Sequence, residues 1–175
     1  SDTIAEVGRG ASVAASGGDV SITAQDDSEV VTFAGALAAS LDGKGIGVGL
    51  DVTVLIKKTE ARVLASDDEF DPTSISSFGS TIVTATSSED LWTLVVNIGA
   101  GDSTAVAGGL VVSVLISDTL AYVGEDTSLL EEGVLPVTGS ATINAGGSLL
   151  ISADSATRTN ASAGSGALSL NAESV

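Results

Sequence analysis

The chain has 175 residues, with 23 Asp and Glu against 6 Lys and Arg, a formal net charge of −17, and no Cys, His or Met. This acidity excludes a basic patch for a nucleic-acid backbone and disfavours electrostatic docking on anionic membranes. The missing Cys and His exclude disulfides, thiolate or imidazole metal sites, Cys nucleophiles and Ser-His-Asp triads. We therefore expect no enzyme activity, no nucleic-acid partner, and acidic side chains that face solvent.

The predicted elements begin with short strand-like stretches. In the stretch at 19–24, Val20, Ile22 and Ala24 alternate with polar residues, and this period of two is typical of a strand with one buried face. An acidic stretch follows, and then a Gly/Ala-rich segment that alternates again. In order, these segments read TIAEV at 3–7, SVAA at 12–15, DVSITA at 19–24, QDDSEV at 25–30 and GIGVGLDVTVLI at 45–56.

The same five segments return twice. The second set reads TEARV at 59–63, SISS at 74–77, STIVTA at 80–85, TSSEDL at 86–91 and AVAGGLVVSVLI at 105–116. The third reads TLAYV at 119–123, TINA at 142–145, SLLISA at 148–153, DSATRT at 154–159 and a weaker AGSGALSLNAES at 163–174. We expect a single segment over 1–175 with repeats near 1–58, 59–118 and 119–175. The insertions DDEFDPTS and TSLLEEGVLPVTGS, which hold Pro72 and Pro136, predict loops.

This pattern predicts an all-β fold. A helix is disfavoured because Gly43, Gly45, Gly47 and Gly49 would each cost about 1 kcal/mol relative to Ala. Long-range self-similarity favours a parallel β-helix (β-solenoid), in which like repeats stack, over the alternative of a β-sandwich. With strands of five to seven residues and about 20 residues per coil as a working estimate, each repeat would supply two or three coils.

Two matching apolar ladders are expected to fill the interior. They are Leu50, Val52, Val54 and Ile56 in one copy and Leu110, Val112, Val114 and Ile116 in the next. Asp51 lies between the apolar positions and is expected outside. On this interpretation Val112→Asp should prevent folding, whereas Asp51→Asn should be nearly silent.

These motifs resemble those of a known family. The run GVGLDVTVLI at 47–56, with TEARV at 59–63 and STIVTATSS at 80–88, resembles the β-strand repeats of large secreted bacterial adhesins, both filamentous-haemagglutinin-like and leukotoxin-like. The resemblance implies a right-handed parallel β-helix that forms a rod or filament on the bacterial surface. It implies no catalytic motif. The weak third Gly-rich copy departs from the pattern.

Small ligands have few candidate residues, and we predict no catalytic, cofactor or metal residue. Among small ligands calcium suits the acidic clusters best, because it prefers hard oxygen ligands, but we favour solvated acidic loops over a calcium site. Asp67, Asp68, Glu69 and Asp71 could also supply the carboxylate pair of a glycosidase, although no aromatic platform beyond Phe70 and Phe78 accompanies them. The clusters are Asp26, Asp27 and Glu29; Asp67 to Asp71; and Glu125, Asp126, Glu131 and Glu132.

We expect the partner to be the chain itself, through stacking. Neither end shows a polar capping unit, so the segment would either continue in a longer chain or stack head to tail on copies. No signal peptide is visible, and the apolar run at 105–116 is shorter than the roughly 20 residues of a membrane-spanning helix. The predicted function is an extracellular structural or adhesive segment. The alternative is a module that binds host glycan or protein through the loops at 66–74 and 125–138.

Overall fold

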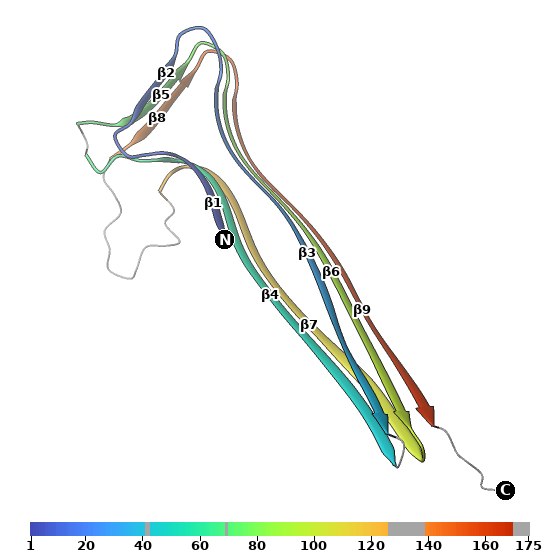
Figure 1. Cartoon of the computed structure of the whole chain (residues 1–175). Helices are drawn as coiled ribbons and strands as arrows, with labels where there is room; N and C mark the ends of the chain where they lie inside the picture. Colours follow the sequence, from blue (N-terminus) through green and yellow to red (C-terminus); the bar gives the residue numbers. More distant parts are fainter. Residues whose placement is uncertain (41–42, 69, 126–138, 170–175) are drawn as a thin grey trace, which may run out of the picture. The chain divides into compact units, whose positions relative to one another are not determined.

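The computed structural model describes residues 1–40, 43–68, 70–125 and 139–169, and these residues form an all-β parallel solenoid (Figure 1). Three parallel sheets have the strand orders β1-β4-β7, β2-β5-β8 and β3-β6-β9. The strands are β1 (Asp2–Val7), β2 (Ser12–Ala15), β3 (Val20–Ser40), β4 (Lys44–Leu64), β5 (Thr73–Ser77), β6 (Thr81–Gly101), β7 (Thr104–Gly124), β8 (Ala141–Ala145) and β9 (Leu149–Ser169).

The strand register follows the internal repeats. Thr3 pairs with Thr59, as the repeated T-x-A-x-V motif predicts. Ser12 pairs with Ser74 and Ser74 with Thr142, so the three short strands align as their sequences do. The prediction of three stacked repeats is therefore confirmed.

The size of a coil was predicted wrongly. Each repeat makes one coil, not two or three, because the Gly-rich segments do not turn back after five to seven residues. Instead β3, β4, β6, β7 and β9 each run for 21 residues. No Pro lies in any of these strands to stop the ladder.

The chain divides into two compact units, and each long strand contributes residues to both. Unit 1 comprises Ser1–Asp27, Ile56–Ser88 and Ile116–Ala156, and unit 2 comprises Ser28–Leu55, Glu89–Leu115 and Thr157–Val175. Unit 1 holds all of the short strands β1, β2, β5 and β8, so three sheets surround its interior. Unit 2 is built from the long strands alone.

Unit 1 has an apolar core of small and β-branched side chains. Val20, Ile22 and Ala24 point inward and are 9%, 8% and 2% exposed, which confirms the predicted face of this strand. Val13, Ile75 and Ile143 lie at equivalent register positions of β2, β5 and β8 and form an inward ladder. The remaining members of the cluster are Ala61, Val63, Val83 and Ala85, with Ala5, Val7, Ala15, Ala121, Val123 and Ala141 packed against them.

In unit 2 the backbones of β4 and β6 approach each other through glycine. A Cβ atom added to Gly45 would lie 2.0 Å from the carbonyl oxygen of Ala100, and one added to Gly47 would lie 2.8 Å from that of Ile98. Such close approach of two backbones is possible only where side chains are absent. Beside these glycines the interior of this unit is therefore too narrow for large side chains, whereas Leu91 and Val95 of β6 are buried elsewhere in the same unit.

This narrow interior overturns the predicted core ladders. Leu50 is 60% exposed and Val112 is 38% exposed, and both ladders lie on the outer faces of β4 and β7. Asp51, expected outside, lies instead on the inner side of β4 with Gly45, Gly47 and Gly49. The alternation was read correctly, but the face was assigned wrongly, because on β4 glycines, and not the large aliphatic side chains, face the space between the sheets.

Candidate functional site

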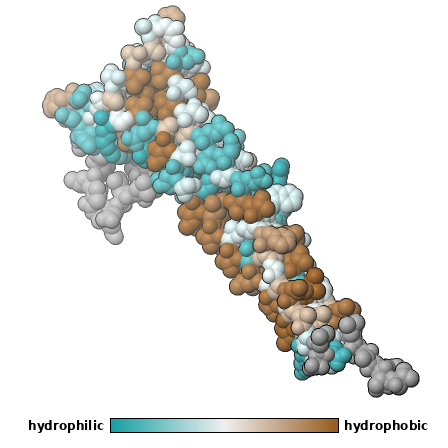
Figure 2. All heavy atoms as spheres, viewed as in Figure 1, coloured by the Kyte–Doolittle hydropathy of each residue, from teal (hydrophilic) through white to brown (hydrophobic). Residues whose placement is uncertain are grey.

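The outer faces of unit 2 carry many exposed apolar side chains, which we call the apolar band. Figure 2 shows such side chains on the surface. They occupy alternate positions on four strands, two in each sheet of this unit, with Gly35 and Gly108 in place of a side chain. The band consists of Val31, Phe33 and Leu37 of β3; Ile46, Val48, Leu50, Val52 and Val54 of β4; Trp92, Leu94, Val96 and Ile98 of β6; and Val106, Leu110, Val112 and Val114 of β7.

Polar and charged residues limit the band at both ends of its strands. Glu29 precedes Val31 on β3 by two residues, and Asp90 precedes Trp92 on β6 by the same interval. At the opposite end lie Lys44, at the start of β4, and Asp102, between β6 and β7. Charged residues therefore limit the apolar surface on β3 and β6, whereas on β4 and β7 it continues to the exposed Ile56 and Ile116.

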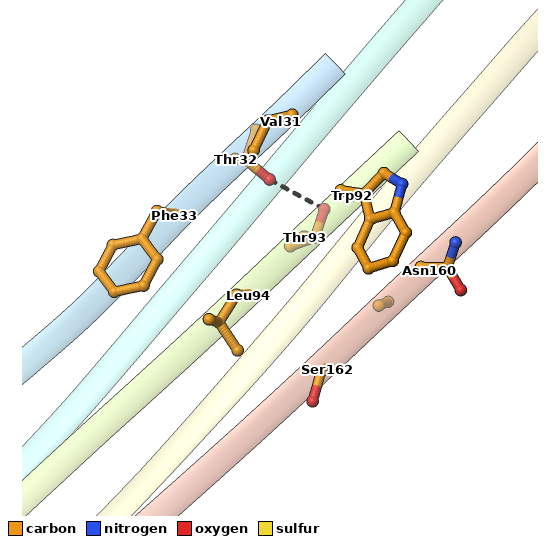
Figure 3. A pocket seen from close by; sticks show the side chains of 9 residues that line it. Val31, Thr32, Phe33, Trp92, Thr93, Leu94, Asn160 and Ser162 are labelled. Carbon is orange, nitrogen blue, oxygen red and sulfur yellow. Dashed lines mark hydrogen bonds between the residues drawn. The ribbon is translucent and has the colours of Figure 1, made fainter. Parts of the chain in front are cut away.

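A hollow of about 430 Å³ lies across β3, β6 and β9 within unit 2 (Figure 3). Val31, Phe33, Trp92 and Leu94 form its apolar part. On β9 the lining changes to Asn160, Ala161 and Ser162, and the figure shows the indole of Trp92 on the side facing Asn160. The hollow arises because large side chains of two strands adjoin small ones of the third.

The inner side of unit 2 is polar and hydrogen-bonded. The hydroxyls of Thr32 and Thr93 lie 2.8 Å apart. Asp51 accepts hydrogen bonds from Thr53 at 3.1 Å and from Thr32 at 3.3 Å. The buried Asn97 accepts one from the backbone N–H of Ala36 at 3.0 Å. The outer faces of this unit are therefore apolar, and its inner side combines these polar groups with the buried Leu91 and Val95 of β6.

Several acids that were expected in solvent lie inside the molecule. Asp26 of the first cluster forms an ion pair with the buried Lys57 and accepts a hydrogen bond from Thr3 at 2.8 Å. Glu89 is 1% exposed and accepts a hydrogen bond from Thr157 at 3.1 Å. Burial of a carboxylate requires such partners, because an unpaired charge loses its hydration without compensation. These acids act as structural groups.

Arg9 connects the loops of the three repeats in unit 1. Its guanidinium contacts Asp67 of the second repeat at 2.7 Å and Glu125 of the third at 2.6 and 2.8 Å. It also donates to the carbonyl of Ala65 at 3.0 Å. The hydrogen bond to Glu125 is the largest influence that raises the pKa of Arg9. Two acids from the predicted calcium clusters are thus paired with one cation.

A second charged group lies on β4 of unit 1, where Glu60 is fully buried between Lys58 and Arg62 at 2.6 and 2.7 Å. The hydrogen bond to Glu60 raises the pKa of Lys58. Burial lowers the pKa of Arg62, but its hydrogen bonds to Glu6 and Tyr122 outweigh that effect, so the pKa is raised overall.

The remaining ligand predictions are only partly covered. Within residues 1–40, 43–68, 70–125 and 139–169, no group of three or more acids is placed to hold a metal ion. Glu69, Asp126, Glu131, Glu132 and most of the loop at 125–138 lie outside the described residues. Calcium binding, a carboxylate pair and recognition of host glycan or protein by the loops stay predictions. In the part of the chain that is described, no helix could cross a bilayer.

The apolar band was missed at the sequence level, although its signal was present. Gly45, Gly47 and Gly49 occupy successive positions on one face of the strand, and large aliphatic residues occupy the other face. A face made of glycine marks the side on which another backbone approaches. This observation assigns the aliphatic face to the exterior. No known protein adds to this assignment, since no family model, curated protein or solved structure matches the chain.

Proposed function

We propose that the chain is a structural β-solenoid module that assembles by stacking rung on rung into a rod or filament, outside the bacterial cell. The observation that carries the proposal is the edge of each sheet. Among the described strands, the first and third of every sheet have a hydrogen-bonded neighbour on one side only. A long unpaired strand edge is a template for another strand.

The parallel register of the three rungs favours the addition of an identical copy to these edges. The three rungs already stack in parallel with matching register, as with Asp2–Val7 beside Lys58–Val63. A copy added to either edge would continue this ladder. β3 and β9 are both 21 residues long, so each addition would form many backbone hydrogen bonds at once.

The experiment uses a proline in the open edge of β3. The backbone N–H of Val20 donates to Ser80 of β6, so that of Thr23, an odd number of residues along the strand, points to the open edge. Thr23→Pro removes this donor and no backbone hydrogen bond to β6. We expect sedimentation and electron microscopy to show linear assemblies of the wild-type chain and a monomeric Thr23→Pro variant.

Thr23→Ala is the matched control, because it also loses the side-chain contact with Ser21 but keeps the backbone N–H. It should assemble like the wild type. A wild-type chain that stays monomeric at high concentration, or a proline variant that assembles equally well, would contradict stacking through this edge.

A further inference from the structure

We propose that β4 carries a docking slot for one short, extended peptide strand, which would pair with β4 in parallel and add a strand to its sheet in unit 2. We call this the β4 slot; it is the edge of β4 from Lys44 to Leu55 that faces away from β7. The proposal goes beyond stacking of copies, because it assigns a partner to the second strand of a sheet and not to the first or the third.

The first observation is that β1 covers only part of β4. β1 pairs with β4 from Lys58 to Val63, whereas β4 itself begins at Lys44 (Figure 1). Among the described residues, only β1 and β7 are hydrogen-bonded to β4 as strands. The other sheet of unit 2 has three long strands, since β3, β6 and β9 each run for 21 residues. In unit 2 the sheet of β4 therefore has one strand fewer than the sheet opposite.

The backbone groups along this edge point into the slot. The backbone N–H of Lys58 donates to the carbonyl oxygen of Ser1 at 3.0 Å, so the even-numbered residues of β4 direct both N–H and C=O toward the side of β1. The side chains of β4 alternate regularly over the slot, so this phase is kept along the strand. The slot thus offers the backbone of five residues as a template for a parallel strand, namely Ile46, Val48, Leu50, Val52 and Val54.

The exposure of nearby side chains agrees with a missing strand. Val52 of β4 is 58% exposed, although Val112, at the same place of the repeat on the edge strand β7, is only 38% exposed. A strand with neighbours on both sides would be the better covered of the two. On the inner side, Thr32 of β3 is half-buried, whereas Thr93 at the matching place of β6 is buried. The slot is therefore open beside β4 and toward β3.

The repeat indicates which strand fits the slot. Residues 1–3 (SDT) recur as residues 117–119, and on β7 the second triplet is preceded by the alternating segment AVAGGLVVSVLI at 105–116. Its inner face carries small residues such as Ala107 and Gly109, which the close approach of the two sheets beside Gly45 requires. Its outer face is aliphatic and would cover the exposed aliphatic side chains of β4 from the side. The partner is therefore a peptide that alternates small and aliphatic residues.

The slot also has a fixed end. The carbonyl oxygen of Ile56 accepts a hydrogen bond from the backbone nitrogen of Ser1 at 2.9 Å, and β1 occupies the edge from there on. A strand in the slot can therefore pair over no more than about twelve residues of β4. β7 of a stacked copy is 21 residues long and would collide with β1 if it entered the slot. This length separates the slot from rung-on-rung stacking and assigns it to a short peptide.

The test measures hydrogen exchange of the full chain with a synthetic peptide, which has the sequence of residues 105–116 and two lysines added at its amino end. Without peptide, the N–H groups of Val48, Leu50 and Val52 should exchange at least about tenfold faster than those of Asp51 and Thr53, which point to β7. Saturating peptide should slow the first set by about tenfold or more. Slow exchange before the peptide is added, or no change after it, would overturn the proposal.

A second peptide controls for non-specific attachment. In it the residues that correspond to Ala107 and Gly109 are both leucine, so its charge is the same but its inner face is too large for the close approach of the sheets. It should leave the exchange unchanged. Equal protection by the two peptides would contradict the slot, because the inner face would then have no effect. Protection confined to β3, β7 or β9 would also overturn it, since the peptide would then lie on an outer edge.

Two variants of the chain test the same edge. Leu50→Pro removes an N–H that points into the slot and no backbone hydrogen bond to β7. Leu50→Ala is the matched control, because it shortens the same side chain and keeps the N–H. The peptide should bind Leu50→Ala as it binds the wild type and Leu50→Pro at least about tenfold more weakly. Circular dichroism checks that both variants fold. Equal binding to the two would mean that this edge does not pair with the peptide.

Sedimentation of the same samples without peptide lets the two proposals fail separately. Thr23→Pro blocks stacking at β3 and leaves the β4 slot unchanged, so the peptide should protect this variant as well. Assembly in buffer without protection by the peptide would overturn the slot and leave stacking intact. Protection by the peptide of a wild-type chain that never assembles would do the reverse.

Discussion

The close approach of the two sheets in unit 2 depends on single glycines, and Gly45 shows why. A Cβ there would meet the carbonyl oxygen and carbon of Ala100 at 2.0 and 2.5 Å, and both are backbone atoms that cannot rotate away. At Gly108 of β7 nothing lies within 4 Å of such a Cβ. The two positions therefore separate the effect of crowding from the effect of losing a glycine.

We expect Gly45→Ala to lower the free energy of unfolding by about 1–3 kcal/mol, because the sheets must shift to admit the methyl group. Gly108→Ala should leave it unchanged or raise it by about 0.4–1 kcal/mol, since it restricts the unfolded chain. Urea titration followed by circular dichroism measures both. Equal values for the two variants would mean that β4 and β6 are not as close as described.

At the level of elements, the repeats in the sequence predict the register well. Matching T-x-A-x-V motifs place Thr3 beside Thr59, because stacking of equal on equal lets identical side chains pack in ladders. The length of the strands was not predictable in the same way. Alternation continues through the acidic stretch after Ala24, where Asp26 pairs with Lys57 and Thr3, residues far away in the sequence.

The candidate site was not predicted, and the reason is general. Alternation tells which residues share a face, but not which face is buried. That choice depends on what stands opposite, and for Ile46 and Val48 the opposite face of the strand is glycine. Ile75, in contrast, faces two further sheets of unit 1 and is fully buried.

This difference gives a test of the inward and outward faces. Ile75→Ala should cost about 2–5 kcal/mol in the free energy of unfolding, as large-to-small substitutions in a core do. Leu50→Ala, at a side chain that is 60% exposed, should change it by about 0.5 kcal/mol or less in buffer. Thermal and urea unfolding give both values. A large loss for Leu50→Ala would return this ladder to the interior.

At the level of the whole molecule, stacking must overcome the repulsion between copies that each carry a net charge of −17. Four of the six cations already form ion pairs within unit 1, namely Arg9, Lys57, Lys58 and Arg62. Most of the remaining acids therefore contribute an uncompensated field, which dissolved salt can screen.

We therefore expect assembly of the wild-type chain to shift to lower protein concentration as NaCl rises, because the screening length falls from about 10 Å at 0.1 M to about 3 Å at 1 M. The shift, measured by sedimentation, should be absent from Thr23→Pro, whose edge is blocked. Ca²⁺ and Mg²⁺ at equal ionic strength should act alike if the acids serve only as a diffuse field. A response to Ca²⁺ alone would instead show that an acidic cluster binds this ion specifically, and the clusters would then take part in assembly as ligands and not only as charge.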